Sequence, residues 1–158
     1  MRDPHLAAAV REWSEGLPRA VREDTMWRMG AYRLGLYVCD TAWDDVTALG
    51  KDVRTRSLAD QLNRSLGSIS ANIAEGYSRG GGRDRARFLE YALGSAREAR
   101  DWYVKGRRVV GAERVQFQVD VLTSVIRLLS VMVRDQRGVH LREPPVLYTT
   151  DGPTDAHN

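Results

Sequence analysis

The chain has 158 residues, of which 42% are apolar and 28% charged, a composition that favours one compact domain with a buried core. The net charge is only +3, yet the basic side chains are almost all arginine, because Lys51 and Lys105 are the two lysines among 24 basic residues. No apolar run approaches the ~20 residues of a membrane span, and the N-terminus does not resemble a signal peptide. We therefore expect a cytoplasmic protein with no membrane contact.

The residues that most enzymes use are scarce or badly placed. The single cysteine, Cys39, excludes an intramolecular disulfide and a cysteine-cluster metal site, and it is better interpreted as a small buried thiol than as a nucleophile. All three histidines lie in terminal segments, so paired Glu-x-x-His motifs cannot hold two metals inside a bundle. We expect no catalytic residues, no metal and no cofactor.

Residues 1–23 form an N-terminal preamble. Apolar residues recur there at helical spacing from Leu6 to Leu17, but Gly16 and Pro18 end the pattern early. Both a short helix that docks on the main body and a frayed arm fit this pattern. At the other end, residues 138–158 contain prolines and no periodicity, so we expect an extended or disordered tail.

Four helices are predicted in the domain between these ends, residues 24–137. They cover residues 24–49, 57–76, 84–106 (or to 111) and 113–137, each with apolar residues at steps of three and four. This pattern predicts an all-α fold, an antiparallel up-down four-helix bundle. Gly76 is placed to be left-handed after the second helix. Gly67 costs that helix ~1 kcal/mol relative to Ala, so we expect a neighbouring backbone to approach it closely.

The fourth predicted helix carries two apolar stripes. One stripe is enough to cover the core of a monomeric bundle, so the second indicates a contact with another subunit. The alternative is a central helix that is surrounded within its own chain. The residues predicted to form the oligomer interface are Val121, Val125, Leu128 and Met132.

Positive charge is concentrated in the middle of the chain. Residues 54–114 carry 13 basic and seven acidic side chains, whereas the rest of the chain has a net charge of −3. A basic face of this kind is what nucleic-acid phosphates meet. The candidate nucleic-acid-binding residues are Arg54, Arg56, Arg64, Arg79, Arg83, Arg85 and Arg87.

The sharpest cluster of these arginines surrounds the glycine loop at residues 80–82. Backbone N–H groups before a helix N-terminus can hold an anion, and guanidinium groups can grip it, although no P-loop motif is present. Tyr77 is the one nearby ring that could stack on a base. The alternative is that these arginines are solvated and pair with Glu75, Asp84 and Glu90.

Asn72 and Glu75 are three residues apart and therefore share one face of the second helix. They could cap the helix, hold an arginine of the third helix or form part of a polar site. We favour a structural role, because an enzyme built around them would lack an acid–base partner such as histidine.

Three segments closely resemble the four helix bundle protein family, also called the 23S rRNA intervening-sequence protein family. They are Leu58–Leu62, Ser68–Gly76 and Arg87–Ser95, and the resemblance extends over about residues 26–137. Ser70 stands where the family usually has proline, which puts a local bend of that helix in doubt. The hallmark positions that the resemblance marks as architectural are Asn72, Glu75, Gly76, Gly94 and Ser95.

The resemblance implies a bacterial protein with a left-handed bundle that assembles as a ring-like homopentamer. It also implies relatives among the accessory variability proteins of diversity-generating retroelements, which bind a reverse transcriptase and nucleic acid. It supplies no catalytic residues.

Together these observations predict a non-enzymatic, oligomeric protein that binds RNA, or a nucleic-acid-associated protein such as a reverse transcriptase, through arginines. The alternative is a protein-interaction scaffold that engages an acidic protein partner without nucleic acid.

Overall fold

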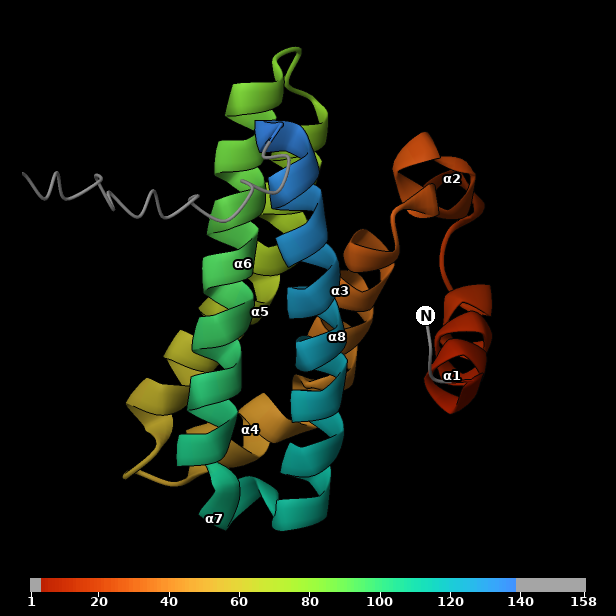
Figure 1. Cartoon of the computed structure of the whole chain (residues 1–158). Coiled ribbons are helices and arrows are strands. Elements are labelled where there is room, and N and C mark those ends of the chain that lie inside the picture. Colours follow the sequence, from red (N-terminus) through yellow and green to blue (C-terminus); the bar gives the residue numbers. More distant parts are fainter. Residues whose placement is uncertain (1–3, 139–158) are drawn as a thin grey trace, which may run out of the picture.

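The fold is a set of packed α-helices in a computed structural model that describes residues 4–138 (Figure 1). No strand occurs in this range, which confirms the predicted all-α class. Both terminal regions outside it, including the predicted tail from residue 139 onward, lie outside the described residues. The helices are α1 (Pro4–Glu15), α2 (Arg19–Glu23), the 3-10 helix η1 (Thr25–Arg28), α3 (Gly30–Thr41), α4 (Trp43–Lys51), α5 (Arg56–Tyr77), α6 (Gly82–Lys105), α7 (Arg107–Val110) and α8 (Ala112–Arg137).

The core lies between α3, α5, α6 and α8, which run side by side (Figure 1). Contacts connect α5 with α6, α6 with α8, α8 with α3 and α3 with α5, so each of the four has two neighbours. Burial of each large aliphatic side chain stabilises this core by about 1.5–3 kcal/mol. The large apolar side chains buried most completely are Leu34, Leu49, Leu62, Leu66, Ile69, Ile73, Leu89, Tyr103, Leu122 and Leu129.

The first predicted helix, residues 24–49, is not continuous, so that prediction was wrong. Asp24 caps the short helix η1 by accepting a hydrogen bond from the Met26 N–H at 2.7 Å. The chain then bends at Ala42, where ψ is −4° instead of the helical value near −42°, and this bend separates α3 from α4. The carbonyl of Thr41 at the bend accepts a hydrogen bond from the side chain of Arg114. A partner distant in sequence thus satisfies the backbone group at the break.

Of the two possibilities for the preamble, the structure shows the docked helix. α1 lies beside α3 (Figure 1), and its residues Leu6 and Val10 are buried. Trp13 at its end meets the ring of Tyr37 edge-on, with ring centroids 5.4 Å apart. The apolar spacing of the sequence therefore forms a short amphipathic helix that covers part of α3.

Gly76 is required for close packing and not for a left-handed turn. It lies inside α5, whereas the positive φ values in the described chain occur at Gly111 and Gly138. A Cβ atom on Gly76 would lie 3.0 Å from the Cβ of Phe88, so the glycine permits the close approach of α5 and α6. The left-handed conformation predicted for Gly76 was wrong.

Two other glycines face open space. A Cβ atom on Gly67 or Gly94 would meet nothing within 4 Å, so the close backbone approach expected at Gly67 is not made within this chain. The hydroxyl of Ser95 donates to the carbonyl of Tyr91, 3.0 Å away on the same helix. Gly94 and Ser95 therefore do not help to pack the core of this chain.

The second apolar stripe of α8 is largely internal. Val121 and Val125 are 1% and 0% exposed, because both pack in the chain's own hydrophobic core. These two residues are therefore not available for an oligomer interface, and their prediction as interface residues was wrong. Leu128 is 36% exposed and Met132 is half-buried. By length and composition alone, α8 is the one described helix apolar enough to cross a membrane; here its most buried side chains pack in the chain's own core.

Candidate nucleic-acid interface

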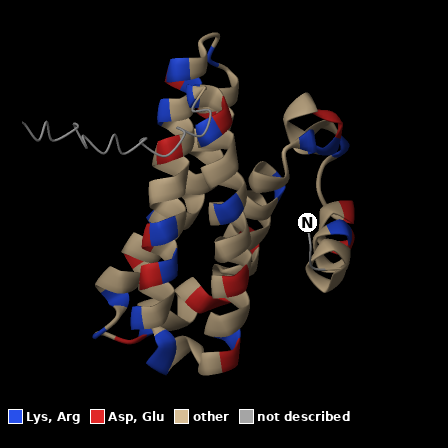
Figure 2. Cartoon of the chain, in the orientation of Figure 1, with Lys and Arg blue, Asp and Glu red and all other residues tan. Residues whose placement is uncertain are grey.

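The seven candidate arginines fall at different places along the molecule. Arg54 and Arg56 lie at the start of α5, Arg64 lies along it, and the other four lie beyond its end. Because α5 has 22 residues, its two ends are about 33 Å apart. Figure 2 shows basic residues gathered at both ends of the helical body. The structure therefore does not bring the predicted residues together into one patch.

At the first end, Arg54 is engaged by a carboxylate of its own loop. Its Nε and Nη2 atoms donate to Asp52 at 3.0 and 2.6 Å. These hydrogen bonds lower the pKa of Asp52 to about 2. Arg56 and Arg64 are exposed and form no ion pair with another described residue. Arg54 is thus the least available cation of this group.

At the second end, arginine side chains alternate with aromatic rings. The guanidinium of Arg79 lies 4.8 Å from the ring centre of Phe88. That of Arg87 lies 5.7 Å from Phe88 and 5.9 Å from Tyr91. The two rings meet at right angles, and Tyr91 is 51% exposed. Arg83 lies on α6 one helical turn before Arg87, so the two share one side of the helix. We call the surface of Arg79, Arg83, Arg87, Phe88 and Tyr91 the arginine–aromatic face.

The carboxylates near this face neutralise only part of it. Glu75 pairs with Arg79, and Glu90 pairs with Arg137 of α8 at 2.5 Å. Arg83 and Arg87 are exposed and have no ion pair within residues 4–138. The alternative in which acidic neighbours absorb the whole cluster therefore applies to Arg79 and not to these two arginines.

Arg85 is turned toward the loop and not toward solvent. Its Nη2 atom donates to the carbonyl of Arg79 at 3.0 Å, and its buried Nε atom has no partner. The side chain also lines a hollow of about 200 Å³ with Tyr77. Arg85 positions the loop that carries Arg79 and is less available for phosphate than the sequence suggested.

The polar pair Asn72 and Glu75 does not form a joint site. The Asn72 side-chain amide donates to the carbonyl of Ser68 at 2.8 Å, within its own helix, whereas Glu75 pairs with Arg79. Both contacts are local and structural. They stabilise the end of α5 from which the arginine–aromatic face begins.

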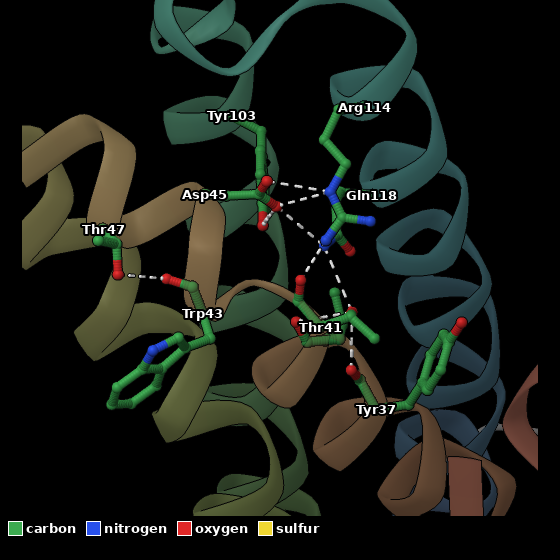
Figure 3. A network of polar contacts seen from close by, with 9 residues as sticks. Tyr37, Thr41, Trp43, Asp45, Thr47, Tyr103, Arg114 and Gln118 are labelled. Carbon is green, nitrogen blue, oxygen red and sulfur yellow. Dashed lines mark hydrogen bonds and ion pairs between the residues drawn. The ribbon is translucent and has the colours of Figure 1, made fainter.

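A buried polar network that the sequence did not predict lies between α4, α6 and α8 (Figure 3). Asp45 is 7% exposed and accepts hydrogen bonds from the Tyr103 hydroxyl and Arg114 Nε, both at 3.0 Å, and from Gln118 Nε2 at 3.1 Å. Burial and the negative charge of Asp45 raise the pKa of Tyr103, which keeps its hydroxyl protonated as the donor. We call these four residues the Asp45 network.

The Asp45 network connects α4, α6 and α8 through a buried carboxylate. Its carboxylate accepts hydrogen bonds from three side chains, and the described residues contain no group of three His, Cys, Asp or Glu side chains that could hold a metal ion. The one signal in the sequence was a carboxylate among the apolar positions of the first helix. The three partners lie 58 to 73 residues away, so local spacing could not identify them.

A profile of the family described as 23S rRNA-intervening sequence protein matches residues 32–127, more than half of the chain. The chain belongs to this family. The match confirms the resemblance inferred from the three sequence segments, and it includes the whole arginine–aromatic face. It excludes α1 and α2, which lie before residue 32.

A solved structure supports the fold of this family member. It is the 1.70 Å crystal structure of a protein of unknown function from the S23 ribosomal protein family of Bacteroides thetaiotaomicron VPI-5482. The two structures align with a TM-score of 0.61 and 22% sequence identity, over 66% of this chain and 98% of the other. No curated protein matches significantly.

Proposed function

We propose that this protein is a non-enzymatic, cytoplasmic four-helix-bundle protein that binds RNA through the arginine–aromatic face. The observation that carries the proposal is that the guanidinium groups of Arg79 and Arg87 lie against the rings of Phe88 and Tyr91. Arg87 and the neighbouring Arg83 have no carboxylate partner among the described residues. The family, described by its link to an intervening sequence of 23S rRNA, supports RNA as the nucleic acid.

The chemistry of this face favours an unpaired RNA segment. Guanidinium groups neutralise phosphates, and a half-exposed ring offers a surface on which a base can stack. In a double helix the bases are already stacked and shielded, so Tyr91 would contribute little there. Binding is therefore expected to fall with salt and to fall further when the RNA is made double-stranded.

Self-association is the second part of the proposal. A homopentameric ring would repeat the face five times and raise the apparent affinity through simultaneous contacts. Exposed apolar residues on α8 are suited to the subunit contact, and of these only Leu128 belongs to the stripe predicted from sequence. They are Phe117, Leu128 and Val131.

RNA binding can be tested by fluorescence anisotropy with a labelled unpaired RNA and its duplex form at two salt concentrations. Arg87→Ala should weaken binding of the unpaired RNA about tenfold, and Tyr91→Ala should weaken it without changing the salt dependence. Arg11→Ala, an exposed arginine on α1, is the matched control. Equal affinity of the wild-type protein and the Arg83→Ala, Arg87→Ala double variant would contradict the proposal.

A protein partner is the competing proposal for the same surface. An acidic protein, or a nucleic-acid-associated protein such as a reverse transcriptase, could contact the exposed arginines and the exposed apolar residues of α8. Affinity capture from cells with and without nuclease distinguishes RNA binding from binding of a protein partner. A partner that survives nuclease treatment, together with no affinity for RNA, favours the scaffold.

A further inference from the structure

A hollow of about 610 Å³ lies between the N-terminal segment and the helical body. Its floor comes from α3, one wall from α4 and α5, and the facing wall from Trp13, Leu17 and Val21. This facing wall precedes residue 32, where the family match begins. The hollow is therefore built partly from residues outside the family match, and it shares no lining residue with the arginine–aromatic face.

Aromatic rings stand on both sides of the hollow, and one of them is held rigidly. Trp13 stacks with Trp27 at a centroid distance of 6.5 Å, and its indole Nε1–H donates to Asp40 at 2.7 Å. Across the hollow, Trp43 is 77% exposed, the second-highest value among the large apolar residues. Figure 3 shows the Trp43 side chain directed away from the Asp45 network. The hollow is thus lined both by the fixed indole of Trp13 and by the exposed indole of Trp43.

The charge of the lining is negative. Asp40 is the one lining residue with a formal charge at neutral pH, since the lining contains no Lys, Arg or His. Asp40 forms no ion pair within the part of the chain described. Burial and the charge of Asp40 raise the pKa of the Cys39 thiol, which therefore stays neutral beside it. The carboxylate charge is left without a cation.

From these observations we infer that the hollow is a binding site for a small organic cation with an apolar body, such as an arylalkyl ammonium. The ammonium group pairs with the Asp40 carboxylate, and the apolar body lies between the indoles of Trp13 and Trp43. The faces of these rings attract a cation in addition to burying the apolar part. The volume is within the range of about 300–1,000 Å³ that small-molecule sites occupy.

This site is independent of the proposed RNA binding. An RNA phosphate is repelled by Asp40, and none of the arginines of the arginine–aromatic face lines the hollow. Each site can therefore fail its test without affecting the other.

The test uses three probes of one shape and different charge: 1-naphthylmethylammonium, 1-naphthylmethanol and 1-naphthoate. The chain has four tryptophans, so each indole N–H gives its own signal in a two-dimensional NMR spectrum. The ammonium should shift the signals of Trp13 and Trp43 in a saturable manner and leave that of Trp102, on α6, unchanged. Naphthoate binding as tightly as the ammonium, or no saturable shift of Trp13 and Trp43, overturns the inference.

Two variants assign the charge recognition to Asp40. Asp40→Asn should weaken binding of the ammonium about fivefold and leave that of the alcohol unchanged, because it removes the charge and keeps an acceptor for Trp13. Asp44→Asn, the matched control, removes an exposed carboxylate outside the lining and should change neither affinity. Equal loss of ammonium binding in both variants would show a general charge effect and contradict the site.

Discussion

Asp45 shows how a single carboxylate can organise the interior of this protein. It lies on α4, next to the bend at Ala42, and receives donors from α6 and α8. Arg114 also donates to the carbonyl of Thr41, so one guanidinium serves the buried charge and the broken helix together. The cost of burying a charge is offset only when such partners are present.

We predict that Asp45→Ala destabilises the protein by about 2–3 kcal/mol, because it leaves Arg114 and two other donors without their acceptor. The estimate is below the usual value for a buried ion pair, since the Arg114 side chain is 35% exposed. Urea denaturation measures the change. Asp44→Ala removes an exposed neighbouring carboxylate and should change the free energy of unfolding by less than about 0.5 kcal/mol. Equal midpoints for the two variants would show that the network contributes nothing.

Tyr103 predicts a pH dependence at the alkaline end. Burial and Asp45 raise its pKa in the folded state above the unfolded value near 10. The stability that this difference contributes is complete below pH ~10 and is lost progressively above it, because the unfolded chain releases the proton first. The urea midpoint should therefore be lower at pH 10.5 than at pH 8.

The variant Tyr103→Phe tests the origin of that difference. It should lower stability at pH 8, because Asp45 loses a donor, and it should reduce the fall between pH 8 and pH 10.5. Tyr32 and Tyr37 have smaller upward pKa shifts, so some pH dependence remains. An unchanged pH dependence in the variant would assign the effect to other groups.

At the scale of elements, the contact between α5 and α6 depends on Gly76. The atoms that a Cβ would meet are the Phe88 Cβ at 3.0 Å and the Arg85 carbonyl at 3.4 Å, both fixed to the backbone of α6. Neither can move aside by a side-chain rotation. The two helices must therefore separate slightly if any side chain is placed there.

We predict that Gly76→Ala destabilises the protein by about 1–3 kcal/mol, the usual range for overpacking. Gly94→Ala, its matched control in the next helix, should raise the melting temperature, because Gly94 is exposed and alanine favours the helix by about 1 kcal/mol. Thermal unfolding followed by circular dichroism compares them. A lower melting temperature for Gly94→Ala would mean that another copy of the chain contacts this side of α6.

The arrangement of the whole molecule decides which apolar residues are free to meet another subunit. Val125 is fully buried against the chain's own helices, whereas Leu128 and Val131 reach the surface of the same helix, α8. A substitution of the buried Val125 should therefore affect folding, whereas substitutions of the exposed Leu128 and Val131 should affect only the association of subunits.

We predict that light scattering gives a mass several times 17.8 kDa for the wild-type protein. The double variant Leu128→Asp, Val131→Asp should lower this mass and retain its helix content, because both side chains are already exposed. Val125→Asp should instead unfold the subunit, since it buries an unpaired charge. A wild-type mass of 17.8 kDa at all concentrations would contradict assembly.

The sequence by itself determined the helical class, most of the helix boundaries and the family. Apolar residues recur at helical spacing along α5, at Leu62, Leu66, Ile69 and Ile73. This spacing can be read from one segment of the sequence alone, without knowledge of the segments that pack against it. The concentration of arginine near residues 79–87 was visible for the same reason.

Only the tertiary structure decided which arginines act together and which apolar residues are covered. Arg79, beyond the end of α5, meets Phe88 of α6. Asp45 binds Arg114 across 69 residues, and Val121 is buried in the core by helices distant from it in sequence. The rotation and depth of each helix in the core set these contacts, and periodicity along one segment contains no information about the segment that packs on it.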